Sequence, residues 1–169
     1  MLQDYSKAID GSKGGLLLSV IGGKMSEGIN FSDKLGRGII VVGLPFPNIH
    51  SVEWEAKLEY VEKAAFERQE AATRDATSEG ALRARAKAAG REFYENACMR
   101  AVNQSIGRAI RHQNDYAVIL LLDRRFEDER VRSKLPGWIQ KGLTEEAGRK
   151  PFTEAMGSIS AFFRSKKAP

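Results

Sequence analysis

Two segments of the sequence combine residue types that can bind a phosphate or a nucleic acid. The first directly follows an apolar run and reads Gly22-Gly23-Lys24-Met25-Ser26-Glu27-Gly28-Ile29-Asn30-Phe31. In an open parallel sheet, ligands bind beyond the carboxyl ends of the strands. Glycine lets the backbone approach a ligand closely or adopt a positive φ. The segment therefore favours a binding loop, and the alternative is a tight strand-to-helix turn with a solvated glutamate.

Common motifs do not explain this loop. A Walker A loop needs glycine at position 18 and serine or threonine after the lysine, but Leu18 and Met25 stand there. A nucleophile elbow around Ser26 needs glycine at position 24, which is Lys24. Local spacing therefore excludes both a P-loop and an α/β-hydrolase nucleophile in this segment.

The second segment carries two arginines and a glutamine at helical spacing. It reads Gln104-Ser105-Ile106-Gly107-Arg108-Ala109-Ile110-Arg111. Residues at i, i+4 and i+7 share one helical face, and the planar guanidinium fork suits phosphate oxygens. A glycine inside a helix costs roughly 1 kcal/mol against alanine. Close approach of a ligand at Gly107 would explain that cost, while the alternative is a solvated basic face.

Composition limits the remaining chemistry. The chain has 169 residues, a formal net charge of +5 and one cysteine. One cysteine excludes a zinc ribbon or a four-cysteine iron–sulfur site built from this chain alone. Cys98 lies in an apolar helical stripe and is expected to pack, and neither His50 nor His112 is placed for catalysis. No apolar run approaches the roughly 20 residues of a membrane helix, so no membrane contact is expected.

Three short apolar runs predict strands buried on both faces, which is typical of parallel sheets. Helical patterns flank these runs, so we expect an α/β fold with a three-layer parallel sheet and flanking helices. The runs are Leu16-Leu17-Leu18-Ser19-Val20-Ile21, Ile39-Ile40-Val41-Val42-Gly43-Leu44 and Ala117-Val118-Ile119-Leu120-Leu121-Leu122.

A long helical stretch is predicted between the second and third runs. It opens with Ser51 as N-cap, and an apolar stripe recurs at Trp54, Leu58, Val61 and Ala65. Residues 66–92 are rich in alanine and charge and are expected to bury little, as an exposed helix or a mobile insertion. Helical periodicity resumes near residue 93 and extends to about residue 112, and residues 151–169 are expected to form a C-terminal helix and tail.

Taken together, these segments resemble the XPD-like iron–sulfur DNA helicases of superfamily two. Residues 24–31, Gly36-Arg37-Gly38 and Gly43-Leu44-Pro45-Phe46-Pro47-Asn48 are similar to motif V of that family. Residues 104–111 are similar to its motif VI, Gln-x-x-Gly-Arg-x-x-Arg. Asp123-Arg124-Arg125-Phe126 and Lys134-Leu135-Pro136-x-Trp138-Ile139 resemble the stretch that follows. Asn30 and the Pro-Phe-Pro-Asn-Ile sequence make the chain most similar to the Chl-type (chromosome-loss) DEAH branch, which acts in sister-chromatid cohesion.

The resemblance implies that the chain is the C-terminal part of the second RecA-like domain of an ATP-dependent 5′–3′ DNA helicase. ATP with magnesium is expected between two RecA-like domains, with the magnesium ligands and a 4Fe–4S cluster outside this chain. The expected partners are single-stranded or forked DNA, the N-terminal motor half and replication or cohesion proteins, in the nucleus. The alternative is a non-catalytic basic module, derived from a helicase, that binds nucleic acid or protein.

The resemblance also implies a role for each motif residue. Arg111 would be the arginine finger, with Arg108 beside it. Without the N-terminal half, no ATP hydrolysis is expected. The residues expected to contact the nucleotide are Gln104, Gly107, Glu27 and Asn30, and those expected to face DNA are Lys24 and Gly28.

Overall fold

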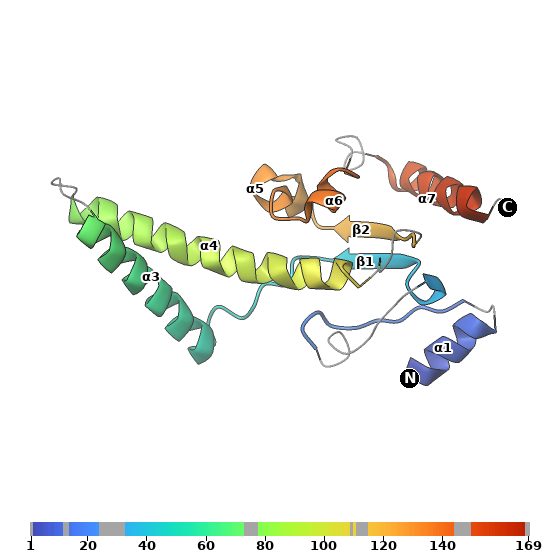
Figure 1. Cartoon of the computed structure of the whole chain (residues 1–169), viewed down its shortest axis with the longest axis horizontal. Helices are drawn as coiled ribbons and strands as arrows, with labels where there is room; N and C mark the ends of the chain where they lie inside the picture. Colours follow the sequence, from blue (N-terminus) through green and yellow to red (C-terminus); the bar gives the residue numbers. More distant parts are fainter. Residues whose placement is uncertain are drawn as a thin grey trace. The chain divides into compact units, whose positions relative to one another are not determined.

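The computed structural model describes residues 2–11, 14–23, 33–72, 78–108, 110, 115–143 and 150–167. The chain forms two compact units, which we term the sheet unit (residues 1–43 and 105–169) and the hairpin unit (residues 44–104). Their helices and strands are labelled in Figure 1.

The sheet unit is built on two parallel strands, β1 (Gly38–Val42) and β2 (Val118–Leu122). Gly38 pairs with Val118 and Val42 pairs with Leu122, so the strands are in register from end to end. Both strands are almost wholly β-branched or leucine residues, which suit a pleated and buried surface. Val41 is 2% exposed, whereas Ile40, Val42 and Leu122 on the other side are 53%, 78% and 54% exposed. Within the described residues, one face of the sheet is therefore largely exposed.

The strand expected at residues 16–21 is not formed. Residues 14–20 are described without strand pairing, and Leu16, Leu18 and Val20 are 78–80% exposed. Among the described residues the sheet has two strands, so the three-layer parallel sheet is not observed. The physical reason is that an apolar run signals a need for burial, whereas a strand exists only where a neighbour accepts its backbone hydrogen bonds. Periodicity alone cannot supply that neighbour.

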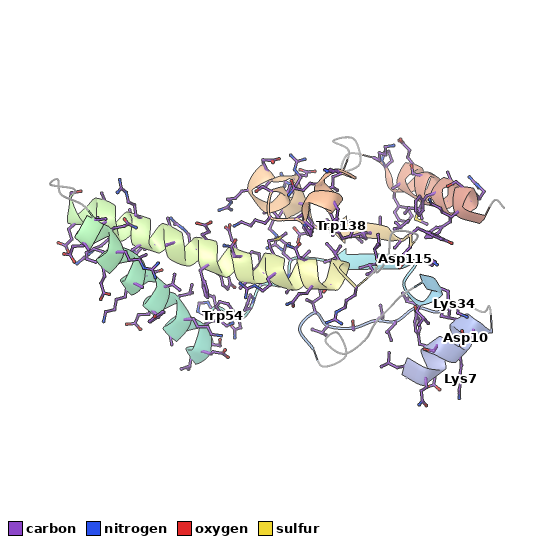
Figure 2. All side chains as sticks on the ribbon, in the orientation of Figure 1. Lys7, Asp10, Lys34, Trp54, Asp115 and Trp138 are labelled. Atoms are coloured by element: carbon purple, nitrogen blue, oxygen red, sulfur yellow. The ribbon has the colours of Figure 1, made fainter. Side chains whose placement is uncertain are left out.

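Helices and 3-10 turns precede and follow the strands in the sheet unit. Helix α1 (Leu2–Asp10), which the sequence patterns did not predict, contacts the 3-10 turn η1 (Asp33–Leu35). The Tyr5 hydroxyl donates to the Leu35 carbonyl at 2.8 Å, and Lys34 pairs with Asp10 at 2.6 Å. Lys34 and Asp10 are labelled in Figure 2. After β2 follow η2 (Arg124–Glu127), α5 (Glu129–Arg132), α6 (Gly137–Gln140) and α7 (Phe152–Lys167). The buried side chains of this segment are Phe126, Val131, Leu135 and Ile139.

The hairpin unit consists of α3 (Val52–Ala72) and most of α4 (Glu79–Ile106). Ser51 precedes α3 as expected for an N-cap, because its Oγ accepts from the Trp54 backbone N–H at 3.4 Å. The Trp54 ring lies 5.9 Å from the Phe93 ring and 5.7 Å from the Tyr94 ring, centroid to centroid. The predicted apolar stripe of α3 therefore packs at one end against aromatic residues of α4.

Tyr94 joins this aromatic cluster to the chain before α3. Its hydroxyl donates to the Pro47 carbonyl at 2.5 Å, and its ring lies 5.1 Å from that of Phe46. Burial raises the pKa of the Tyr94 phenol above its ordinary value of 10.0, because desolvation penalises the tyrosinate. Tyr94 therefore anchors the segment that leads into the hairpin.

Residues 66–72 and 79–92 are helical, and they bury more than expected. Leu82 and Ala86 are 7% and 5% exposed, and Gly90 is buried. These residues are spaced i, i+4 and i+8, so they form one stripe of α4. A Cβ built on Gly90 would lie 2.8 Å from Cγ of Glu62, so α3 and α4 approach closely there. Small residues of this stripe leave room for a side chain of α3, as Gly90 does for Glu62, which large-residue periodicity does not reveal.

Candidate functional site at the carboxyl end of the sheet

The carboxyl ends of β1 and β2 bring a glycine and a carboxylate together. Gly43 follows β1 with φ of +79°, and its N–H donates to the Leu122 carbonyl at 3.0 Å. A Cβ built on Gly43 would lie 4.0 Å from Asp123 Oδ2. The positive φ explains why glycine stands here. This edge is where open parallel sheets bind ligands.

Asp123 organises the loop that leaves β2. Its Oδ1 accepts from the Arg125 backbone N–H at 2.9 Å, which caps η2. The same carboxylate holds the Arg125 guanidinium through Nε at 2.9 Å and Nη2 at 2.7 Å. This two-point contact is the fork geometry that arginine offers to a carboxylate. The Asp-Arg-Arg-Phe segment therefore fixes one guanidinium at the carboxyl end of the sheet.

The first predicted binding loop is described only at its beginning. Gly22 has φ of +79°, and the Gly23 N–H donates to the Val20 carbonyl at 3.0 Å. The expectation that a glycine here adopts a positive φ is confirmed at Gly22. The other residues predicted in this loop lie outside the described residues; they are Lys24, Glu27, Gly28 and Asn30.

The second predicted segment departs from one continuous helical face. Helix α4 ends at Ile106, six residues before the expected end near residue 112. Gly107 and Arg108 form a turn, in which the Arg108 N–H donates to the Ser105 carbonyl at 3.3 Å. Gln104 is exposed on the last turns of the helix and Arg108 is half-buried, while Arg111 lies outside the described residues. Arg108 therefore lies just beyond the end of the helix that carries Gln104, because glycine ends a helix more readily than it continues one.

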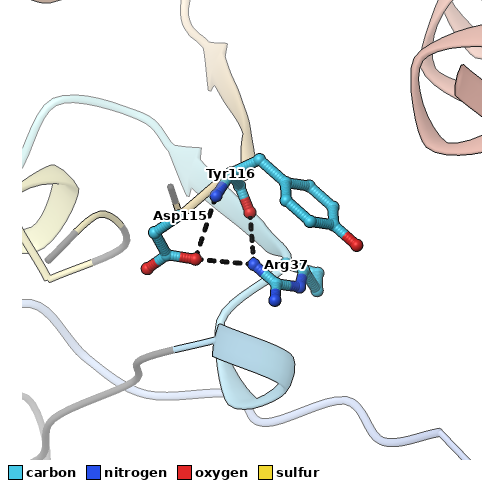
Figure 3. Close-up of polar contacts among 3 residues, drawn as sticks. All are labelled: Arg37, Asp115 and Tyr116. Atoms are coloured by element: carbon cyan, nitrogen blue, oxygen red, sulfur yellow. Dashed lines mark hydrogen bonds and ion pairs between the residues drawn. The ribbon is translucent and has the colours of Figure 1, made fainter. Parts of the chain in front are cut away.

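A charged cluster of Arg37, Asp115 and Tyr116 joins the amino ends of β1 and β2 (Figure 3). The sequence analysis did not predict it. The Arg37 Nη1 donates to Asp115 Oδ1 at 2.6 Å and to the Tyr116 carbonyl at 2.8 Å. Its guanidinium also lies 3.9 Å from the centre of the Tyr116 ring. The available signal was an arginine before one apolar run and an aspartate before the next. Parallel pairing places two such residues side by side.

The part of the chain that the structure describes offers few side chains that could together bind a metal ion. No group of three or more histidine, cysteine, aspartate or glutamate residues there is placed to hold a metal ion. Cys98 is 0% exposed within α4, and a single cysteine does not fit a cluster held by four. No described helix is long and apolar enough to cross a membrane.

The family of the chain follows from a family model described as "Helicase C-terminal domain", which matches residues 1–142. The chain belongs to the helicase C-terminal domain family. This match includes both strands, the helical hairpin and the Asp123–Arg125 loop. The carboxyl edge of the sheet is therefore part of a helicase C-terminal domain.

Curated relatives are similar over nearly the whole chain. The ATP-dependent DNA helicase chl1 of Neosartorya fischeri is 51% identical over 168 residues, which cover 99% of this chain. The helicase of the same name from Coccidioides immitis is 54% identical over 168 residues, and that of Schizosaccharomyces pombe is 49% identical over 165. The chain spans about a fifth of the length of these relatives, between 18% and 19%. The chain thus matches one section of much longer proteins.

Proposed function

We propose that this chain is the C-terminal motor portion of a Chl-type ATP-dependent DNA helicase that moves 5′ to 3′. The observation that supports this most directly is about 50% identity to proteins named ATP-dependent DNA helicase over at least 98% of this chain. In this proposal the chain acts in chromosome maintenance, in sister-chromatid cohesion and replication or repair, within the nucleus. Its partners are single-stranded or forked DNA, the N-terminal motor half, and replication or cohesion proteins.

The chain's part in ATP hydrolysis is to stabilise charge on the phosphates. We assign Arg111 as the arginine finger with Arg108 beside it. Fingers of this kind contribute about 10³–10⁵ in rate in nucleotide hydrolases. The residues assigned to the nucleotide are Gln104, Gly107, Glu27 and Asn30, and those assigned to DNA are Lys24 and Gly28. Guanidinium and amide donors fit the phosphates of ATP. In this proposal the magnesium ligands lie outside this chain, as the family resemblance implies.

The test is a chimera in which this chain replaces the matching fifth of the Schizosaccharomyces pombe relative. The proposal predicts DNA-stimulated ATP hydrolysis by the chimera. Arg111→Ala should abolish that hydrolysis while leaving binding to single-stranded DNA intact. Arg111→Lys should remain inactive, because lysine keeps the charge but loses the planar fork. Arg100→Ala, an exposed α4 residue outside the motif, is the matched control and should be active.

Two results would contradict the proposal. Hydrolysis that survives Arg111→Ala would reject the finger assignment. Robust ATP hydrolysis by the isolated 169-residue chain would reject the need for the N-terminal motor half.

The alternative is a non-catalytic basic module that keeps helicase-derived residues. Such a module needs its positive charge but not the Gln-x-x-Gly-Arg-x-x-Arg pattern, which is complete at residues 104–111. A chimera that binds DNA normally but never hydrolyses ATP would favour this alternative.

A further inference from the structure

Helix α4 carries a stripe of positive charge on the hairpin unit, away from the helicase motifs. Arg83, Lys87 and Arg91 are spaced i, i+4 and i+8, so they lie on one face of the helix with a rise of about 6 Å between neighbours. All three are exposed. No acidic residue occurs between Gly80 and Arg91. We term these three residues the basic stripe.

The fold fixes which way the basic stripe points. Each of its residues directly follows a buried residue of α4, in the order Leu82, Ala86 and Gly90. Successive helical residues are rotated by about 100°. The stripe therefore flanks the face that packs on α3, and packing of the hairpin holds it in place.

The charges of the basic stripe are available to a ligand. Arg83 pairs with Glu79 at 2.5 Å, but both side chains are about two-thirds exposed, at 70% and 67%. Such an exposed i,i+4 pair contributes only about 0.3–0.5 kcal/mol and is readily exchanged for another anion. Within the described residues, Lys87 and Arg91 have neither an ion pair nor a side-chain hydrogen bond. A polyanion would therefore displace at most one weak contact.

We propose that the basic stripe binds the phosphate backbone of single-stranded DNA, as a contact separate from motifs V and VI. Its exposed neighbours on α4 are Ala84, Arg85, Ala88 and Glu92, so no large apolar or aromatic side chain interrupts it. Protein interfaces rely on buried aromatic or aliphatic anchors, whereas phosphate contacts need only positive charge. The choice of DNA rests on the proposed helicase function, and the stripe extends that function to the hairpin.

The experiment measures fluorescence anisotropy of a labelled oligothymidylate of about 20 nucleotides with the full chain. The stripe variant combines Arg83→Gln, Lys87→Gln and Arg91→Gln, since glutamine preserves helix propensity. Single-strand contacts contribute a salt slope of about −0.7 per phosphate, so losing three should reduce the slope by about 2. If the two proteins bind equally at about 1 M salt, this slope difference corresponds to a loss of affinity of about 100-fold at about 0.1 M salt.

A control variant separates position from net charge. Lys63→Gln, Arg68→Gln and Arg100→Gln remove the same three charges from exposed positions elsewhere on the hairpin unit. The control should keep the wild-type slope, with both variants matching the wild type by circular dichroism. An equal loss in both variants, an unchanged stripe variant, or no binding by the wild type would each overturn the proposal.

Two further arms separate the proposal from its rivals. Polyglutamate that displaces the oligonucleotide at equal charge concentration would assign the stripe to an acidic protein instead. In the chimera, the stripe variant should raise the DNA concentration needed for half-maximal ATPase stimulation without lowering the maximal rate. If the unaltered chimera does not hydrolyse ATP, the proposed function is rejected. The oligonucleotide experiment would still test whether the basic stripe binds DNA.

Discussion

Arg37 and Asp115 are 78 residues apart in the sequence, and their side chains meet at 2.6 Å. The Asp115 side chain is 0% exposed and that of Arg37 is 28% exposed. Asp115 also accepts from the Tyr116 N–H at 2.9 Å, and Arg37 donates to the Tyr116 carbonyl. The pair therefore joins the residues that precede β1 and β2 and sets the strands in register.

Arg37→Ala should destabilise the sheet unit by about 3 kcal/mol, because it removes the Arg37 guanidinium from a buried carboxylate. Arg37→Lys should also destabilise it, since lysine cannot reproduce both contacts and the stacking on Tyr116. Urea unfolding followed by Trp138 fluorescence, in a Trp54→Phe background, reports on this unit. Arg124→Ala, at an exposed position, should change stability by less than about 0.5 kcal/mol. Equal effects of the two alanine variants would contradict a structural role for the pair.

The effect of Gly90→Ala on the stability of the hairpin unit should change sign when the residue at position 62 is changed. The added methyl would clash with Glu62 Cγ at 2.8 Å, which outweighs the roughly 1 kcal/mol gain in helix propensity. In a Glu62→Ala background the clash is gone, and Gly90→Ala should stabilise the hairpin by about 1 kcal/mol. Trp54 fluorescence, in a Trp138→Phe background, measures both.

Gly80→Ala is the control for that cycle. A Cβ at Gly80 would meet nothing within 4 Å, so alanine should not destabilise α4 in either background. If Gly90→Ala has the same effect with and without Glu62, the close approach of α3 and α4 does not explain the glycine.

Tyr94 should make the hairpin sensitive to alkaline pH. Its pKa is raised above 10.0 in the folded chain, so the folded state holds the phenol proton more tightly than the unfolded state. The stability that Tyr94 contributes is therefore fully present below pH 10 and is lost as the pH rises through its folded pKa. The difference in urea midpoint between wild type and Tyr94→Phe should shrink between about pH 9 and pH 11. A difference that is constant over this range would show that the buried hydroxyl does not carry the effect.

Asp123→Ala should destabilise the loop after β2 by about 1 kcal/mol, because η2 loses its N-cap. Asp123→Asn should cost less, since its side-chain oxygen still accepts from the Arg125 N–H, although the contact between Asp123, 12% exposed, and Arg125, 53% exposed, loses its charge. Trp138 fluorescence during urea unfolding ranks the two variants. Asparagine that proves as damaging as alanine would assign the effect to charge rather than to capping.

Val42→Thr should reduce self-association of the isolated chain at little cost in stability. Val42 is 78% exposed and lies on the largely exposed sheet face with Ile40 and Leu122. Contiguous exposed apolar surface favours association, and threonine keeps the β-branched shape that a strand prefers. Sedimentation velocity over a range of concentrations measures the change. Val41→Thr, at a position only 2% exposed, should instead lower the urea midpoint.

Local sequence patterns predicted the elements whose signals are complete within a few residues. The apolar runs at 39–44 and 117–122 correspond to β1 and β2, and Ser51 precedes α3 as its cap. These predictions succeeded because strand propensity and capping are short-range properties. The run at 16–21 carries the same local signal without forming a strand, because pairing depends on a neighbour that the run does not contain.

By itself the sequence determined the helicase family resemblance, the α/β composition and the positions of both strands. The tertiary structure decided that Arg37 meets Asp115, that Gly90 lies against Glu62, and that α4 ends before Arg108. Each of these outcomes depends on residues far apart in the chain or on the end of a helix. Propensity and spacing describe what a segment can form, whereas close packing and the burial of charge select which partners it meets.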